Sequence, residues 1–399
     1  MPKDSILTRS RRVLSSVALL LLAACAVPDA DRAIENGTGT STAKPRIEDG
    51  DGALTLEQSH AILASLAVRA DGTEILQRHL AIESAIAGTP LIGDNAVQVL
   101  RDGPETFRAI ATVIKGAKHD LLLEYYTIDD VILEHGEDGE TRLSDLLLAK
   151  RHEGVAVSIL YDSFGSSDTA GEFFERLSQA GVQLLEYHPV APTNPVNILT
   201  LNNRDHRKIL VADGAVAVVG GVNLSKDYES KVPGGSDDDE PARSLPTEAG
   251  AEEVMNPAAQ ETEEWRDTSI RIDGPAAREL QTLFREHWQS QNGEPLPPAL
   301  PAPKSDAKGN QVVRIIGSTP DEDMPRYYVT LISALRNAEA KVWVSASYFV
   351  PTPEEKEELI AAAERGVDVR LLLAGSSDSQ EAVAAAQTHY TDLCLLYTS

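Results

Sequence analysis

Two stretches of this sequence repeat the same order of helix, strand and loop, and this repeat constrains the fold more than any other feature. The first stretch reads LLLAKRHEGVAVSILYDSFGSSD, and the second reads LIAAAERGVDVRLLLAGSSDS. In both, a helix ends at a Gly-Val pair, an apolar strand follows, and a loop of Gly, Ser and Asp ends the strand. A match of this order and length predicts an internal duplication.

Strands and helices alternate in both copies. The first copy is expected to contain two short helices within Leu54–Ala87, a strand at Ala96–Leu100, a helix to about Lys118, a strand at His119–Thr127, a helix at Arg142–His152 and a strand at Val155–Tyr161. The second is expected to contain a strand at Val312–Ile316, a helix near Arg326–Ala338, a strand at Lys341–Tyr348, a helix at Pro353–Arg365, a strand at Val367–Ala374 and a helix at Glu381–Thr391. This alternation predicts an α/β fold in which each half is a mixed β-sheet flanked by helices.

These patterns also predict the domain boundaries. A first domain is expected over residues 53–291, and the start of a second domain over residues 311–399. Residues 292–310 are rich in Pro and Ala and are expected to be the linker between them. The second half is predicted to be incomplete, because its repeat stops after the helix at Glu381–Thr391.

The first 25 residues have the pattern of a lipoprotein signal peptide. A basic segment precedes a short apolar core, Val13–Leu22, which is too short to span a bilayer permanently. The core ends in Leu-Ala-Ala-Cys, which resembles a bacterial lipobox, so we expect cleavage before Cys25 and lipidation of its thiol rather than an ordinary secretory signal. Because Ala26 follows the cysteine, resemblance to Gram-negative lipoproteins implies a lipid-anchored protein that faces the periplasm at the outer membrane. Residues 26–52 are expected to be a flexible tether.

The chain is strongly acidic, with 36 Lys and Arg against 62 Asp and Glu and a net charge of −26. This balance disfavours the broad basic face that nucleic-acid binding normally requires, so no nucleic-acid partner is expected. The stretch from Glu229 to Glu264 contributes eleven acidic and two basic residues. It lacks aromatic residues and periodicity, so we favour a disordered acidic insert over a regulatory flap.

One segment has the pattern of a β-hairpin with chemistry at its open end. On a strand, residues two apart share a face, so His206 and Lys208 are expected to project together. Asp213 and the glycine after it predict a hairpin turn, and the returning strand ends at Gly220 and Gly221. Asn223 follows, so the hairpin returns an amide to the histidine and lysine. A nucleophile, a cation, an amide and glycine N–H donors around one point form a suitable site for a phosphate oxyanion.

This combination, H-x-K-x4-D-x6-G-G-x-N, resembles the signature of the phospholipase D superfamily at every position. The flanking pattern N-x-R-x-H-R-K, Tyr228 after the G-G-x-N, and the run Trp265-Arg266-Asp267-Thr268 resemble the bacterial cardiolipin synthase branch. The resemblance runs from about Val97 to Asp392. It implies a duplicated phospholipase D-like fold and a phosphatidyltransferase that acts on anionic phospholipids such as phosphatidylglycerol.

The resemblance also implies roles for individual residues, with no metal and no cofactor. His206 is the nucleophile or the paired acid of a two-step reaction through a phosphohistidine. Lys208 and Asn223 hold the non-bridging oxygens, and Asp267 matches the acid that fixes the tautomer of the histidine. The remaining candidates are Asp213, which the family uses structurally, Gly220 and Gly221, and Arg204, which is either an extra anion contact or part of a structural salt bridge.

Other aromatic and histidine side chains are given structural roles. Tyr125 and Tyr126 end a core strand and are expected to pack there, although one could line the mouth of the site. The remaining histidines show no metal-ligand spacing with Cys, Asp or Glu. They are His60, His79, His119, His135, His152, His188, His287 and His389.

The family needs two such motifs, and the second His-x-Lys is expected beyond Ser399. We favour a longer enzyme, truncated here, over a homodimer in which two chains each supply His206. Three other functions remain open: a phospholipase D hydrolase, a periplasmic nuclease or other phosphodiesterase on the same fold, and a lipoprotein without activity.

Overall fold

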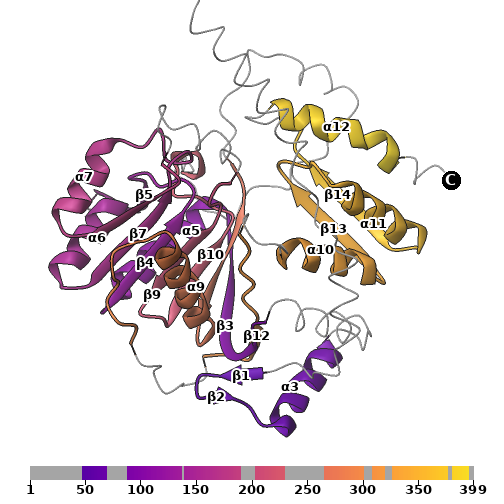
Figure 1. Cartoon of the computed structure of the whole chain (residues 1–399), viewed down its shortest axis with the longest axis horizontal. Coiled ribbons are helices and arrows are strands. Elements are labelled where there is room, and N and C mark those ends of the chain that lie inside the picture. Colours follow the sequence, from indigo (N-terminus) through magenta and orange to yellow (C-terminus); the bar gives the residue numbers. More distant parts are fainter. Residues whose placement is uncertain are drawn as a thin grey trace, which may run out of the picture. The chain divides into compact units, whose positions relative to one another are not determined.

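A computed structural model describes residues 47–69, 88–136, 139–189, 203–229, 265–300, 308–319, 326–375 and 380–394 (Figure 1). The chain divides into two compact units. The large unit comprises residues 46–59 and 89–320, and the small unit comprises residues 1–45, 60–88 and 321–399. The predicted signal peptide, Cys25 and nearly all of the predicted acidic insert lie outside the described residues.

One mixed sheet of ten strands forms the centre of the large unit, in the order β2-β1-β3-β11-β10-β9-β4-β7-β8, with β12 paired to β3. The bounds are β1 Ile47–Asp49, β2 Gly52–Ala53, β3 Leu91–Arg101, β4 Asp120–Tyr125, β7 Ala156–Asp162, β8 Gln183–Tyr187, β9 Lys208–Ala212, β10 Val216–Gly220, β11 Thr268–Asp273 and β12 Gln311–Val313. β4, β7 and β8 are parallel, whereas β3, β11, β10, β9 and β4 are antiparallel neighbours. β5 (Ile132–Gly136) and β6 (Gly139–Arg142) form a separate hairpin.

Helices cover both faces of this sheet (Figure 1). α5 (Asp102–Gly116), α6 (Leu143–His152) and α7 (Gly171–Gln179) bury one apolar cluster, and α9 (Ala276–Ser290) buries another. β9 contributes to both, because Leu210 and Ala212 face the first cluster while Ile209 and Val211 face the second. A strand buried on both faces is held firmly, and burial of each such aliphatic side chain contributes about 1.5–3 kcal/mol.

The predicted hairpin is formed by β9 and β10. Asp213 and Gly214 at its turn have positive φ angles of 55° and 60°, as the tight Asp-Gly turn requires. Val216 lies opposite Ala212, and Val219 lies opposite Ile209. The register therefore returns the end of β10 to the start of β9.

The small unit repeats the helix–strand order of the large one. Its elements are α10 (Arg326–Asn337), β13 (Lys341–Ala346), α11 (Pro353–Glu364), β14 (Asp368–Leu373) and α12 (Gln380–Cys394), and α3 (Leu56–Arg69) begins in the large unit. β13 and β14 pair in parallel. A small core of Leu335, Phe349, Leu359, Ala386 and Leu393 holds the helices against them. The predicted order of elements is confirmed here.

Two predictions at the boundaries are wrong. β12 was expected to begin the second half, but it pairs antiparallel with β3, so the large unit extends to residue 320 rather than 310. β1 lies within the predicted tether, yet it pairs with β2 and β3. Both strands have only three residues, and the composition of so short a strand does not distinguish it from a linker.

Candidate active site

His206 and Lys208 lie together at the start of β9. Lys208 is 4% exposed, and its Nζ donates a hydrogen bond to the His206 carbonyl oxygen at 2.9 Å. Both side chains adjoin Tyr126, whose ring centroid is 4.8 Å from the His206 ring and 5.2 Å from Lys208 Nζ. The predicted pair is therefore formed, with an aromatic ring beside it.

The surroundings keep His206 neutral. Loss of hydration and the Lys208 charge lower the pKa of His206 from 6.5 to about 4, while Asp162 and Asp267 act in the opposite direction. The side chain still has solvent-exposed surface. A neutral imidazole has a free lone pair at neutral pH, as a nucleophile requires.

Lys208 is a buried cation next to acidic groups rather than in an ion pair. Burial lowers its pKa from 10.5 to about 7, against the opposing charges of Asp205, Asp267 and Asp162. A bound anion beside the ammonium would offset its lost hydration. The arrangement therefore favours an anionic ligand over a neutral one.

Asn223 joins the site from the end of the hairpin. It is 7% exposed, and its Oδ1 accepts a hydrogen bond from the Thr127 backbone N–H at 3.2 Å. Thr127 follows β4, whose Tyr125 lies opposite Lys208. Because the oxygen is held in this way, the amide nitrogen is oriented as a donor.

Asp267 acts on the catalytic pair through its charge. It raises the pKa of both His206 and Lys208, and its Oδ1 accepts a hydrogen bond from the Thr268 backbone N–H at 2.7 Å. A Cβ on Gly221 would lie 2.1 Å from Asp267 Oδ1, so glycine is needed there to admit the carboxylate. The Gly221 N–H donates to the Thr268 carbonyl at 3.0 Å, and it is therefore not the anion donor that we predicted.

Gly220 is explained by packing in the sheet rather than by a ligand. A Cβ there would lie 2.4 Å from Ser269 Cα on β11. Its prediction as a phosphate contact therefore has no support from this geometry.

Asp213 does not join the site. It lies at the other end of β9 and accepts the backbone N–H groups of Lys118, His119 and Asp120 at 2.9, 2.8 and 3.0 Å. These contacts favour the structural role that the family resemblance implied for Asp213 over a place in the catalytic set.

Arg204 also has a structural environment. Its Nη1 lies 3.6 Å from Asp162 Oδ1 and donates to the His188 carbonyl at 3.2 Å. The guanidinium carbon lies 5.7 Å from the centre of the Phe164 ring. Of the two predicted roles, these contacts favour the structural salt bridge.

Sequence reasoning missed Asp162, which ends β7 and is completely buried. Its Oδ2 accepts the Asp205 backbone N–H at 3.0 Å, and its charge raises the pKa of both His206 and Lys208. An acidic residue at the carboxyl end of an apolar strand was the available signal. Tyr126 was expected to pack at the end of a core strand or to line the mouth of the site, and its ring lies beside both His206 and Lys208.

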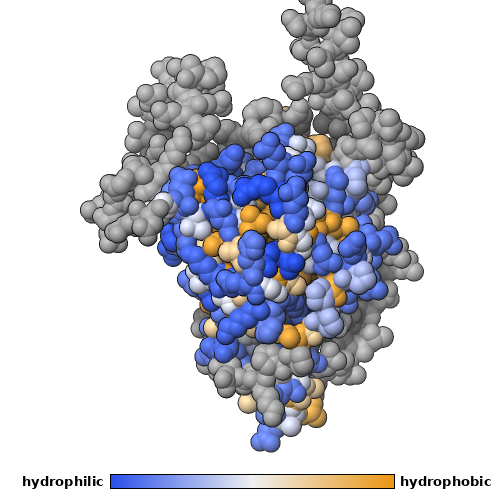
Figure 2. All heavy atoms as spheres, turned by 90° about the vertical axis from the view of Figure 1, so that its left-hand side faces the viewer, coloured by the Kyte–Doolittle hydropathy of each residue, from blue (hydrophilic) through white to orange (hydrophobic). Residues whose placement is uncertain are grey.

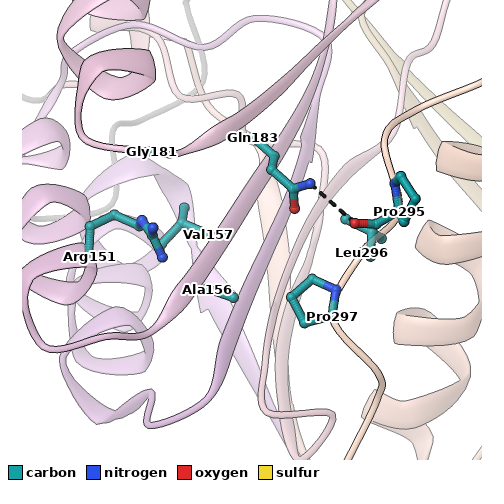
Figure 3. Close-up of a pocket in the computed structure, with 8 residues that line it drawn as sticks. All are labelled: Arg151, Ala156, Val157, Gly181, Gln183, Pro295, Leu296 and Pro297. Carbon is teal, nitrogen blue, oxygen red and sulfur yellow. Dashed lines mark hydrogen bonds between the residues drawn. The ribbon is translucent and has the colours of Figure 1, made fainter.

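A hollow of about 350 Å³ lies elsewhere on the large unit (Figure 3). Its lining comes from α6, the amino ends of β7 and β8, and Pro295–Pro297. Figure 3 shows the Gln183 amide directed at this last segment, to the Pro295 carbonyl at 3.3 Å. Arg151, the charged residue in the lining, donates to the Val155 carbonyl at 2.7 Å. This hollow is thus at the opposite end of β7 from Asp162, and it has no nucleophile.

Comparison with known proteins gives the family. The family model described as "Cardiolipin synthase, PLD-like domain" matches residues 110–231 and again 331–397, in both halves of the repeat. The cardiolipin synthase of Alkalihalophilus pseudofirmus is 31% identical over 310 residues, which are 76% of this chain and 54% of that protein. The chain belongs to the phospholipase D superfamily. The double match also supports the predicted duplication.

Further relatives agree with this family. The cardiolipin synthase of Geobacillus thermodenitrificans is 32% identical over 297 residues, covering 74% of this chain and 52% of that protein. The chain thus spans about half the length of the curated relatives that it matches. Among solved structures, a phospholipase D family member, Nuc from Salmonella typhimurium, covers 49% of this chain at 18% identity with a TM-score of 0.30.

Proposed function

We propose that this protein is a phosphatidyltransferase of the phospholipase D type, similar to cardiolipin synthase, that acts on phospholipid phosphodiesters. The observation that carries the proposal is the neutral His206 beside the buried Lys208 ammonium. This pair offers a nucleophile and a cation to the same phosphate. The relatives named cardiolipin synthase support the lipid substrate.

The proposed reaction has two steps. The His206 imidazole attacks phosphorus, and the bond from phosphorus to the leaving alcohol breaks as that alcohol takes a proton from a second acid. An acceptor alcohol then attacks the phosphohistidine and releases His206. Lys208 and the Asn223 amide stabilise the charge on the non-bridging oxygens in both steps. A second histidine, from a further segment or a partner copy, would serve as the acid.

We further propose that an anchor at Cys25 holds the protein on the membrane, facing the periplasm, at the outer membrane of a Gram-negative bacterium. In the described residues, no helix is both long enough and apolar enough to cross a bilayer. The face of the molecule in Figure 2 is largely hydrophilic, and its apolar residues form small patches. Several buried acyl chains would give firm attachment, because each methylene contributes about 0.8 kcal/mol.

The test is lipid turnover by the full-length protein. We expect cardiolipin from vesicles that contain phosphatidylglycerol, and no product from His206→Ala. Phosphatidic acid in place of cardiolipin would assign hydrolysis instead of transfer. Cleavage of a single-stranded oligonucleotide without any action on lipid would assign a nuclease, and wild type matching His206→Ala on all substrates would contradict the proposal.

A further inference from the structure

A second cluster of charged groups lies under β9, on the face of the sheet that α9 covers. Asp205 and Arg207 alternate with the catalytic pair along the chain and meet Glu124 of β4 and His287 of α9. Glu124 Oε1 accepts a hydrogen bond from Arg207 Nη1 at 3.1 Å and lies 2.8 Å from His287 Nδ1. One atom each of Glu124, Asp205 and His287 lies within 4.8 Å of the others. These three residues are only 0, 5 and 9% exposed.

Two carboxylate oxygens of this cluster lack a partner. Glu124 Oε2 and Asp205 Oδ2 are buried and accept no hydrogen bond from the residues that the structure describes, although His287 Nδ1 lies 4.0 Å from Asp205 Oδ2. The other oxygen of Asp205 accepts the Arg207 backbone N–H at 3.2 Å. One carboxylate oxygen of Glu124 and one of Asp205 lie within 4.8 Å of each other in this buried place, and two carboxylates that share a site do not both stay ionised without a proton or a cation beside them.

The charges of the cluster favour a proton. With both acids ionised and His287 neutral, two negative charges face the single positive charge of Arg207. One proton brings the sum to zero, whereas a divalent cation would leave a net positive charge in a buried place. A guanidinium at 3.1 Å from Glu124 Oε1 would also repel such a cation.

We propose that Asp205 and Glu124 share one buried proton at neutral pH, and that this pair, whose single negative charge is balanced by Arg207, positions the nucleophile His206. The shared proton gives each orphan oxygen a partner. Asp205 directly precedes His206, and its backbone N–H donates to Asp162 Oδ2 at 3.0 Å. The segment is thus held by its side chain on one face of the sheet and by its backbone at the end of β7. Asp205 acts through the backbone and is a positioning residue.

The groups around Asp205 set the direction of its titration. They are Glu124 of β4, Asp162 of β7, His287 of α9, Lys208 of β9, and Arg207 directly before β9. Burial, followed by the Glu124 charge, raises the pKa of Asp205 well above its usual range, and Arg207 acts against this. The folded protein therefore keeps a proton that the unfolded chain releases above about pH 4. The contribution of Asp205 to the free energy of unfolding is therefore complete below about pH 4. It is lost as the pH rises through the pKa that Asp205 has in the folded protein.

The test compares thermal unfolding of the full chain between pH 5 and pH 9. Asp205→Asn copies the shape of the protonated acid and cannot ionise. Its Tm should therefore fall less than that of wild type as the pH rises. The exposed Asp168→Asn is the matched control and should stay parallel to wild type. Glu124→Gln should reduce the fall of Tm with rising pH, as Asp205→Asn does. The double variant should have the lowest Tm, because Arg207 then loses both carboxylates.

Positioning has its own measurement, which rests on the proposed function. At pH 7 we expect Asp205→Asn to keep lipid transfer within about threefold of wild type, whereas Asp205→Ala loses about tenfold in kcat with an unchanged KM. The unfolding experiment needs no activity, so it decides the shared proton even if the protein has another substrate.

Three results would overturn the proposal. The first is parallel Tm curves for wild type and both single variants. The second is a weaker dependence of Tm on pH in His287→Gln but not in Asp205→Asn, which would place the proton on the imidazole. The third is a stoichiometric metal ion in wild type, measured by elemental mass spectrometry, that is absent from Asp205→Asn.

Discussion

The two halves of the repeat place the same pair of parallel strands in different surroundings. In the large unit, β4 and β7 pair with Asp120 opposite Ala156, and in the small unit, β13 and β14 pair with Lys341 opposite Asp368. The register therefore gives a residue-by-residue correspondence between the halves. Beyond this pair, β9 adds to β4 and α9 covers one face in the large unit alone, as far as the described residues extend.

Exposure at matching positions shows the consequence. Leu122 and Leu160 of the large unit lie in the cluster under α9 and are 1% and 0% exposed. Their counterparts Trp343 and Leu372 in the small unit are 60% and 73% exposed. The strand pair therefore occurs in both halves, but in the described residues only the large unit has a helix, α9, that buries these positions.

The charged surroundings of the catalytic pair differ in the same way. Glu124 corresponds to Ser345, and Asp162 corresponds to Ala374. Two acids that lie near His206 thus have neutral counterparts in the small unit. Both halves therefore have the strand framework, whereas, in the part of the chain that is described, the candidate site lies in one half.

The largest expected effect tests this division. His206→Ala should lower lipid turnover by about a thousandfold or more, because it removes the nucleophile. His389→Ala on α12 is the matched change in the small unit and should leave turnover within about twofold. Product is measured by mass spectrometry of lipids after circular dichroism has confirmed folding. An equal loss in both variants would mean that the two halves share the chemistry.

Two substitutions at matching strand positions test the difference in burial between the two units. Leu160→Ala should cost about 2–5 kcal/mol of stability, because it leaves a cavity between the sheet and α9. Leu372→Ala at the matching exposed position should cost less than about 0.5 kcal/mol. Chemical denaturation followed by fluorescence measures both. If Leu372→Ala were equally costly, another segment or chain would have to cover that face.

The sequence predicted the strands, the helices and the catalytic hairpin because each has a local signal. A continuous apolar run indicated β9, and the Asp-Gly pair indicated its turn. The pairing of β12 with β3 has no such signal, because the partner strand is far away in the sequence. Asp162 had a local signal at the end of an apolar strand, but its effect on His206 depends on the assembly of β4, β7 and β9. The contacts of His287 had no local signal, because Glu124 on β4 and Asp205 before β9 are far from it in the sequence.

The buried ammonium gives a smaller and pH-dependent effect. Because the pKa of Lys208 is lowered to about 7, the cation is present at pH 6 and mostly lost at pH 8. Affinity for sulfate, whose charge is constant over this range, should therefore fall about tenfold between those values. Isothermal calorimetry should show no such binding for Lys208→Met. Lys341→Met on β13 should behave as wild type, and a pH-independent affinity in wild type would contradict the assignment.

The smallest effect concerns Asp213, the one signature residue that lies away from the catalytic pair. Its carboxylate holds three backbone N–H groups between α5 and β4, so it ties the hairpin to the strand pair that both halves share. Asp213→Asn keeps one acceptor oxygen and should cost about 1 kcal/mol of stability. Since no catalytic group moves, kcat at 25 °C should be unchanged. A tenfold fall in kcat with an intact fold would instead show that this tie sets the position of His206 at the far end of β9.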